Sequence, residues 1–161
     1  MSPSRDEPRR TEAHGWTLLA WREFARQYAA LQAEVRRLRQ ADPEGYRGHP
    51  RAKLFALLVH LLFEVIPANP DAPQFRQGNT LGTAHRHWRR AKFARRFRLF
   101  FRFHSPSRVI VYTWLNDEDT LRKAGARTDP YVVFRQMLER GRPPSEMADL
   151  LEEADRLDEP D

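Results

Sequence analysis

The stretch HRHWRRAKFARRFRLFFRFHSPSRVIVYTWLNDED, residues 85–119, contains three segments in which apolar residues alternate with basic or polar ones. Successive side chains on a β-strand point to opposite faces of the sheet, so a period of two is typical of strands. The pattern predicts strands at residues 88–94, 96–104 and 108–116. The short SPS turn at residues 105–107 makes the last two strands a hairpin.

The charge of this stretch indicates a polyanionic partner. No acidic residue lies between Asp71 and Asp117, whereas ten arginines and lysines do. In the strand at residues 96–104, one face is apolar, and the other face consists of Arg96, Arg98, Phe100, Arg102 and His104. Arginine binds phosphate through paired hydrogen bonds and stacks on bases, so we expect one core face and one open face that binds nucleic acid. A solvated basic sheet face without a ligand is the alternative.

The segments on either side predict helices that cover the sheet. A strand is expected at residues 15–21, followed by an amphipathic helix at 21–41, where apolar residues recur at spacings of three and four. A second helix, residues 50–66, is apolar around nearly its whole circumference, which marks a buried element. These helices form an antiparallel hairpin that can cover one face of the sheet. The later segments predict a rigid non-helical link at 67–73, a helical turn begun by Asp117, a helix at 129–141 and a short helix from 144.

Composition sets limits on the class of protein. The chain has 161 residues and no cysteine, which excludes disulfides, thiolate metal sites and cysteine nucleophiles. Its longest apolar run, residues 54–66, is too short and too polar to span a bilayer, and no secretory signal is visible. We therefore expect a cytoplasmic protein without membrane contact. Its single domain is expected at residues 14–151, between a disordered N-terminus (1–13) and an acidic disordered tail (152–161) that could screen the basic face or simply aid solubility.

The order of these elements, with the segments TLG, WRRAKF, RFRLFFRF, VIVYTWLNDEDT and YVVFRQML, resembles the YhaV toxins of the RelE superfamily of type II toxin–antitoxin systems. The resemblance extends over about residues 15–151. It implies an α+β, RelE/ParE-like fold, in which an antiparallel sheet of about four strands is packed by an N-terminal helical hairpin and a C-terminal helix. It also implies an endoribonuclease that cuts mRNA on translating ribosomes. A PrlF-type antitoxin of the swapped-hairpin class would neutralise it, and the pair would bind operator DNA only as a complex.

The basic residues suit a metal-independent cleavage that needs no cofactor. In that reaction the 2'-hydroxyl of the RNA attacks the adjacent phosphorus and leaves a cyclic phosphate and a 5'-hydroxyl. The protein must accept a proton, donate a proton and stabilise the charge of the phosphorane. Crowded cations can stabilise that charge directly, and they lower the pKa values of neighbouring lysines and histidines, which favours a neutral base.

The resemblance implies roles for particular residues. Arg98 matches the arginine of the family's strand motif, and Lys92 lies where the preceding strand carries basic residues. Beyond the last strand the chain departs from the superfamily's pattern, so Arg122 or Lys123 would have to serve, with Tyr131 a distant aromatic candidate. We further expect substrate contacts from Arg90, Arg96, Arg102, His104, Trp114, Asn116 and Lys123.

Some assignments stay open at this stage. His85 and His87 can transfer protons or can be exposed loop histidines, and as a metal site they lack a third ligand close in the sequence. Trp114 can stack a base or fill the core, and Asn116 can cap the following turn. A ParE-like toxin that inhibits a topoisomerase, or a non-catalytic RNA- or DNA-binding module, would share the fold without the proton chemistry.

Overall fold

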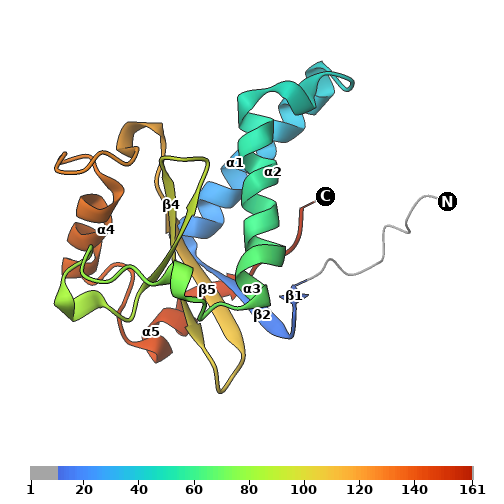
Figure 1. Ribbon diagram of the computed structural model, residues 1–161. Helices are drawn as coiled ribbons and strands as arrows, with labels where there is room; N and C mark the ends of the chain where they lie inside the picture. Colours follow the sequence, from blue (N-terminus) through green and yellow to red (C-terminus); the bar gives the residue numbers. More distant parts are fainter. Residues whose placement is uncertain (1–10, 161) are drawn as a thin grey trace.

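The computed structural model describes residues 11–160, which form a sheet with helices on both of its faces (Figure 1). The first ten residues of the expected disordered N-terminus lie outside this range. The next part of that segment is ordered, because β1 (Glu12–Ala13) pairs with β2 (Trp16–Trp21). The three strands predicted between residues 88 and 116 are confirmed. They are β3 (Arg89–Phe93), β4 (Phe97–His104) and β5 (Val109–Leu115).

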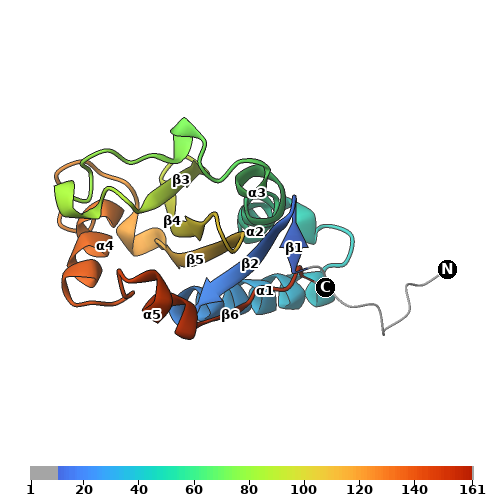
Figure 2. The same ribbon diagram turned by 90° about the horizontal axis from the view of Figure 1, so that it is seen from below.

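The sheet has the strand order β1-β2-β5-β4-β3, and the C-terminal β6 (Ala154–Arg156) also pairs with β2 (Figure 2). Neighbouring strands are antiparallel except for β2 and β5, which are parallel. The expected antiparallel sheet of about four strands is therefore wrong in strand count and in direction. Strands of two or three residues, such as β1 and β6, are too short to show a periodic pattern in the sequence.

The helical hairpin packs on one face of the sheet. It consists of α1 (Arg22–Ala41) and a long second helix made of α2 (Pro50–His60), a π-helical turn (Leu61–Val65) and α3 (Ile66–Ala68). Pro67 lies inside this long helix, directly after the π-helical turn, where the backbone hydrogen-bonding pattern changes, so the predicted non-helical link begins too early. This face holds the larger core, which includes Phe24, Leu58, Phe101 and Tyr112.

The second face of the sheet is covered by α4 (Pro130–Glu139) and α5 (Met147–Glu152), as Figures 1 and 2 show. Phe134 of α4 stacks on Phe100 with ring centroids 4.3 Å apart, and Trp88 and Trp114 complete a second core. The expectation of a wholly open cationic face is thus wrong. The aromatic side chains among its arginines provide the apolar surface on which α4 docks.

A β-bulge at Thr113 changes the alternation along β5. Phe100 pairs with Trp114 and Phe101 pairs with Tyr112, so Thr113 is an extra residue opposite this step, and its hydroxyl donates to the Phe100 carbonyl (2.7 Å). Strict alternation would place Trp114 on the same face as Tyr112. The bulge instead turns Trp114 to the α4 side, while Tyr112 and Leu115 face the hairpin.

The C-terminal segment up to Pro160 packs along the domain, whereas the sequence predicts a disordered tail at residues 152–161, of which Asp161 lies outside the described residues. After β6, Leu157 is buried in the larger core, its N–H donates to the Leu18 carbonyl (2.9 Å), and the Tyr28 hydroxyl donates to the Asp158 carbonyl (3.3 Å). One buried leucine and a few backbone bonds are enough to hold a segment whose composition is acidic. Within residues 11–160, no helix is long and apolar enough to cross a membrane.

Candidate active site

The candidate site lies where the β3–β4 hairpin meets the segment that connects β5 to α4. Strand pairing sets Lys92 opposite Arg98 and Arg90 opposite Phe100, so these three basic side chains share the face that α4 covers. The turn between the strands includes Ala94 and Arg95, both in the left-handed region (φ 45° and 65°). This conformation allows the chain to reverse within three residues and brings the Arg95 carbonyl to the Arg98 guanidinium, at 2.9 Å.

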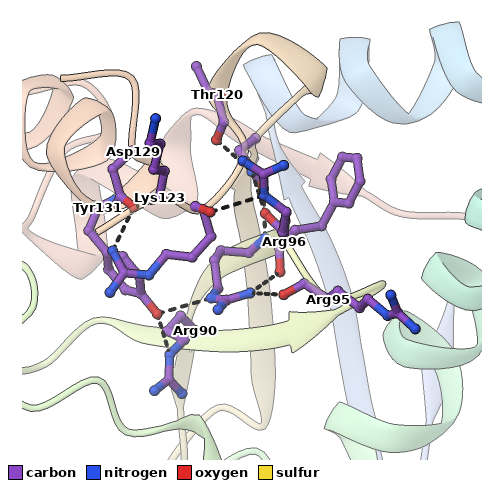
Figure 3. Close-up of polar contacts among 11 residues, drawn as sticks. Arg90, Arg95, Arg96, Thr120, Lys123, Asp129 and Tyr131 are labelled. Atoms are coloured by element: carbon purple, nitrogen blue, oxygen red, sulfur yellow. Dashed lines mark hydrogen bonds and ion pairs between the residues drawn. The ribbon is translucent and has the colours of Figure 1, made fainter. Parts of the chain in front are cut away.

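The Tyr131 hydroxyl, on the first turn of α4, joins two arginines from different strands (Figure 3). It accepts hydrogen bonds from Nε of Arg90 (2.8 Å) and Nε of Arg98 (3.2 Å). Arg90 also donates to the Gln74 carbonyl (2.8 Å), and Arg98 to the Phe97 carbonyl (2.9 Å). Both arginines are at least nine-tenths buried, and neither forms an ion pair with a carboxylate in the described part of the chain. Their Nη2 groups make no hydrogen bond there, so these donors are available to a ligand.

A third arginine is held by the buried carboxylate of Asp129. Nη1 of Arg122 donates to Oδ2 of Asp129 at 2.6 Å, and the Arg122 guanidinium lies 4.8 Å from the centroid of the Tyr131 ring. Asp129 is 1% exposed and also accepts from the backbone N–H groups of Lys123 (2.8 Å) and Tyr131 (3.0 Å). The carboxylate therefore caps α4 and fixes Arg122 against Tyr131 at the same time.

Backbone contacts attach the Arg122 segment to the start of β4. Arg96 and Arg122 exchange two hydrogen bonds, from Arg122 N–H to the Arg96 carbonyl (3.0 Å) and from Nε of Arg96 to the Arg122 carbonyl (3.1 Å). The Asn116 side chain accepts from the Arg98 N–H (2.6 Å) and donates to the carbonyls of Arg96 (3.1 Å) and Thr120 (2.8 Å). Asn116 is 2% exposed and all three of these bonds go to backbone groups, so its side chain positions the backbone, and its contact with substrate stays a prediction.

Together these residues form what we call the cationic cluster, namely Arg90, Lys92, Arg95, Arg96, Arg98, Arg122 and Lys123. The only carboxylate bonded to it within residues 11–160 is that of Asp129. Lys92, Arg95, Arg96 and Lys123 are exposed. A hollow of about 280 Å³ lies on the other side of Tyr131 and is lined by Thr80, Val132, Arg135, Gln136 and Glu139, none of which belongs to the cluster. Concentrated guanidinium donors with little neutralising charge suit a phosphodiester or its pentacoordinate transition state.

The structure separates the two histidines from this cluster. His85 and His87 lie 6.5 Å apart (ring centroids) beside Arg102, whose guanidinium lies 5.4 Å from the Trp88 ring and donates to the Ser145 carbonyl. Arg102 is four residues beyond Arg98 on β4, a distance of ~13 Å along a strand. The sequence leaves His85 and His87 open between proton transfer and exposed loop positions, and in the structure they group with Arg102.

Burial and like charge shift the pKa values of His87 and Arg102. Burial lowers the pKa of His87, and the positive charges of Arg102, His85 and Arg89 lower it further, against an opposing effect of Glu146. Burial also lowers the pKa of Arg102, which Glu146 opposes. His87 is therefore neutral near pH 7 and able to accept a proton or a hydrogen bond.

Two other predicted substrate contacts lie elsewhere. Trp114 is 6% exposed and stacks against Phe100 and Phe134, so the core interpretation holds for it. His104 is at the far end of β4, where Nδ1 lies 2.6 Å from the Ser107 hydroxyl in the hairpin turn. Within the described residues, no three histidine, aspartate or glutamate side chains are grouped to hold a metal ion.

Comparison with known proteins identifies the family. A family model described as a toxin with endonuclease activity, of toxin–antitoxin system, matches residues 18–155. The chain belongs to the YhaV toxin family. It is 43% identical over 152 residues to the ribonuclease toxin YhaV of Escherichia coli strain K12 and to the toxin YhaV of Escherichia coli O157:H7, covering 93% of this chain and 97% of each relative. No solved structure matches.

Membership of the YhaV family gives the central position of Tyr131 a functional context. The sequence names Tyr131 only as a distant candidate, because it lies well beyond the end of the last strand, where the superfamily places an aromatic residue. In the structure it meets Arg98 across 33 residues. The Asp-Pro-Tyr sequence predicts a helix cap, and the apolar stripe of α4 predicts that Tyr131 points inward. Neither signal shows that its hydroxyl meets two arginines of the sheet.

Proposed function

We propose that this chain is a RelE/ParE-like toxin that acts as a ribosome-dependent mRNA endoribonuclease and is neutralised by a PrlF-type antitoxin. Membership of the YhaV family and the 43% identity to a ribonuclease toxin support the nuclease activity. The observation that carries the proposal is the attachment of Arg90 and Arg98 to one hydroxyl, with Arg122 over the same ring. Dependence on the ribosome, repression of the operon by the complex and the antitoxin class follow from the resemblance alone.

The cationic cluster supplies the electrostatic part of RNA cleavage. The bonds that Arg90 and Arg98 make through Nε and Nη1 hold both guanidinium groups still and direct the remaining N–H donors to a phosphate. Such fixed donors stabilise the phosphorane without reorganising during the reaction. Arg122, which is about one-third exposed, can approach the same phosphate from the side of α4.

Proton transfer at the scissile phosphate falls to groups within the cluster. The Tyr131 hydroxyl lies between the arginines, and Lys92 is the exposed amine opposite Arg98. His85 and His87 group with Arg102, four residues beyond Arg98 on β4, and fit contacts with another part of the RNA strand. The products would be a cyclic phosphate and a 5'-hydroxyl, formed by attack of the substrate's own 2'-hydroxyl.

The test is mRNA cleavage mapping in a translation extract, with wild type compared with Arg98→Lys and Lys92→Ala. Lysine keeps the charge at position 98, but its single ammonium group lacks the spread donors with which the guanidinium reaches Tyr131 and two carbonyls. We therefore expect the cleavage rate to fall about a hundredfold or more. Lys92 is exposed, so its replacement should lower cleavage without lowering stability. Arg37→Lys, an exposed change on α1, is the matched control.

Three results are needed to support the proposal. Cuts should carry 5'-hydroxyl ends, disappear in Arg98→Lys and require initiation, which a reaction with ribosomes but no initiation tests. Cleavage of free RNA at the same rate would remove the ribosome from the proposal. Intact mRNA with a folded protein would favour a ParE-like or purely binding toxin.

A further inference from the structure

A groove of about 870 Å³ runs along the helical hairpin, away from the cationic cluster. Most of its lining is apolar, from Val35 of α1 and from Phe55, Ala56, Leu57 and Val59 of α2, and Pro160 of the C-terminal segment lies at its border. It is several times larger than the hollow beside Tyr131 and within the range of volumes that bind a ligand or an inserted side chain. None of its residues takes part in the site already described.

The composition of α2 does not match its exposure. A helix that is apolar around its whole circumference is typical of an element buried on all sides, but α2 packs mainly on α1, where Phe55 contacts Tyr28. Leu57 is 50% exposed and is the one exposed large apolar side chain within residues 11–160. Ala56 beside it is exposed as well. The helix therefore carries an apolar side that its own domain leaves uncovered, which is a feature of interaction surfaces.

The border of the groove is predominantly basic. Arg39, Arg47, Lys53 and His60 line it, and Glu64, the one carboxylate among the described residues that line it, lies 3.1 Å from Nε2 of His14. Along α2, Lys53, Ala56, Leu57 and His60 follow one another at helical spacing, so the apolar and basic groups form one stripe. A partner that fits this stripe needs apolar side chains flanked by acidic ones.

We infer that this groove binds an amphipathic, acidic helix of the antitoxin. An amphipathic helix places anchors at i, i+3, i+4 and i+7 into such a groove, here against Leu57 and Phe55, with its acidic flank towards Lys53, Arg39 and Arg47. The family supplies the partner, because a toxin of a toxin–antitoxin system is held by an antitoxin. The inference concerns the hairpin and does not depend on how RNA is cleaved.

The test measures binding of the purified antitoxin from the same locus to three variants of the full chain. Leu57→Glu places a charge at the apolar anchor and should weaken binding about thirtyfold or more. Lys53→Glu should mainly slow association and reduce its dependence on salt. Arg37→Glu makes the same charge reversal on an exposed part of α1 that does not line the groove, and it should bind as wild type does.

RNA cleavage by the toxin alone should be unchanged in Leu57→Glu, but the antitoxin should no longer suppress it. Antitoxin affinity that is unchanged in both Leu57→Glu and Lys53→Glu would overturn the inference. So would a wild-type dimer that Leu57→Glu converts to a monomer, because a second copy would then occupy the groove. Lys53 is exposed, so if Leu57→Glu fails to fold, an unchanged antitoxin affinity in Lys53→Glu alone would overturn the inference. Affinities are measured without RNA, so a failure of the proposed nuclease function would not affect this result.

Discussion

Asn116, Asp129 and Tyr131 determine where the arginines of the cationic cluster lie, although none of the three is basic. Asn116 fixes the backbone of Arg96 and Arg98, Asp129 holds Arg122, and Tyr131 accepts from Arg98 and Arg90. A buried polar group without a hydrogen bond destabilises the fold. Each of these contacts therefore restricts the others to one arrangement. The geometry of the cluster is therefore set by neutral and acidic neighbours at single positions.

At the residue scale, the lowered pKa of His87 predicts a loss of stability in acid. Because the folded protein binds this proton less readily than the unfolded chain, stability is independent of this group above about pH 6.5 and falls as the pH drops towards the folded pKa. Urea unfolding of wild type and His87→Gln from about pH 8 to about pH 5 checks this. The wild type should lose stability relative to the variant only in the acidic part of the range. In an Arg102→Gln background the difference should shrink, and a constant difference at all pH values would contradict the prediction.

At the element scale, α4 joins the second core to the candidate site. Phe134 and Leu138 pack into the core, and Tyr131, one turn earlier on the same helix, meets the arginines. The bulge at Thr113 contributes to this arrangement, because it turns Trp114 towards Phe134. Docking of one helix thus determines both the packing of the core and the position of a hydroxyl group.

Phe134→Ala should lower the free energy of unfolding by about 3–5 kcal/mol, because it leaves a cavity between Phe100, Trp88 and Trp114. It should also abolish RNA cleavage in protein that is still folded, since α4 no longer holds Tyr131 against the sheet. Urea unfolding and cleavage mapping measure the two effects. Val133→Ala, a partly buried position on the same helix, should cost much less and keep activity. Equal losses in both variants would show that α4 is not docked through Phe134.

At the scale of the whole molecule, both ends of the described chain close the same edge of the sheet. β1 and β6 pair with different parts of β2, and Leu157 enters the core on the hairpin side. An unpaired edge strand invites pairing with other chains, so these short strands also protect β2.

Leu157→Ala should lower the free energy of unfolding by about 2–3 kcal/mol and release β6 from β2. Hydrogen exchange at the Leu157 amide, which bonds to the Leu18 carbonyl, reports the release directly. Asp155→Asn, an exposed change in β6, serves as the control. A variant as stable as the wild type would mean that the C-terminal segment contributes nothing to the fold.

Local patterns in the sequence predict the fold class and most of the elements. Each of these patterns depends on a few neighbouring residues. They are the alternation of apolar and basic residues in RFRLFFRF, the apolar spacing of three and four in α1, and the Asp-Pro start and glycine end of α4. The same patterns, with the absence of acidic residues between positions 72 and 116, indicate a polyanionic ligand. The family is also evident from these segments, and the comparison confirms it.

Only the tertiary structure decided the contacts between segments that are far apart in the chain. Four features depend on how the elements pack against one another. α4 covers the centre of the basic face, and the bulge turns Trp114 towards that helix. The C-terminal segment pairs with β2, and His85 and His87 lie beside Arg102. The sequence by itself determined which residues are basic, apolar or helix-forming, because those properties act over a few residues. Tertiary packing decided which of the arginines share the Tyr131 hydroxyl, because a hydrogen bond across 33 or 41 residues leaves no periodic trace in the sequence.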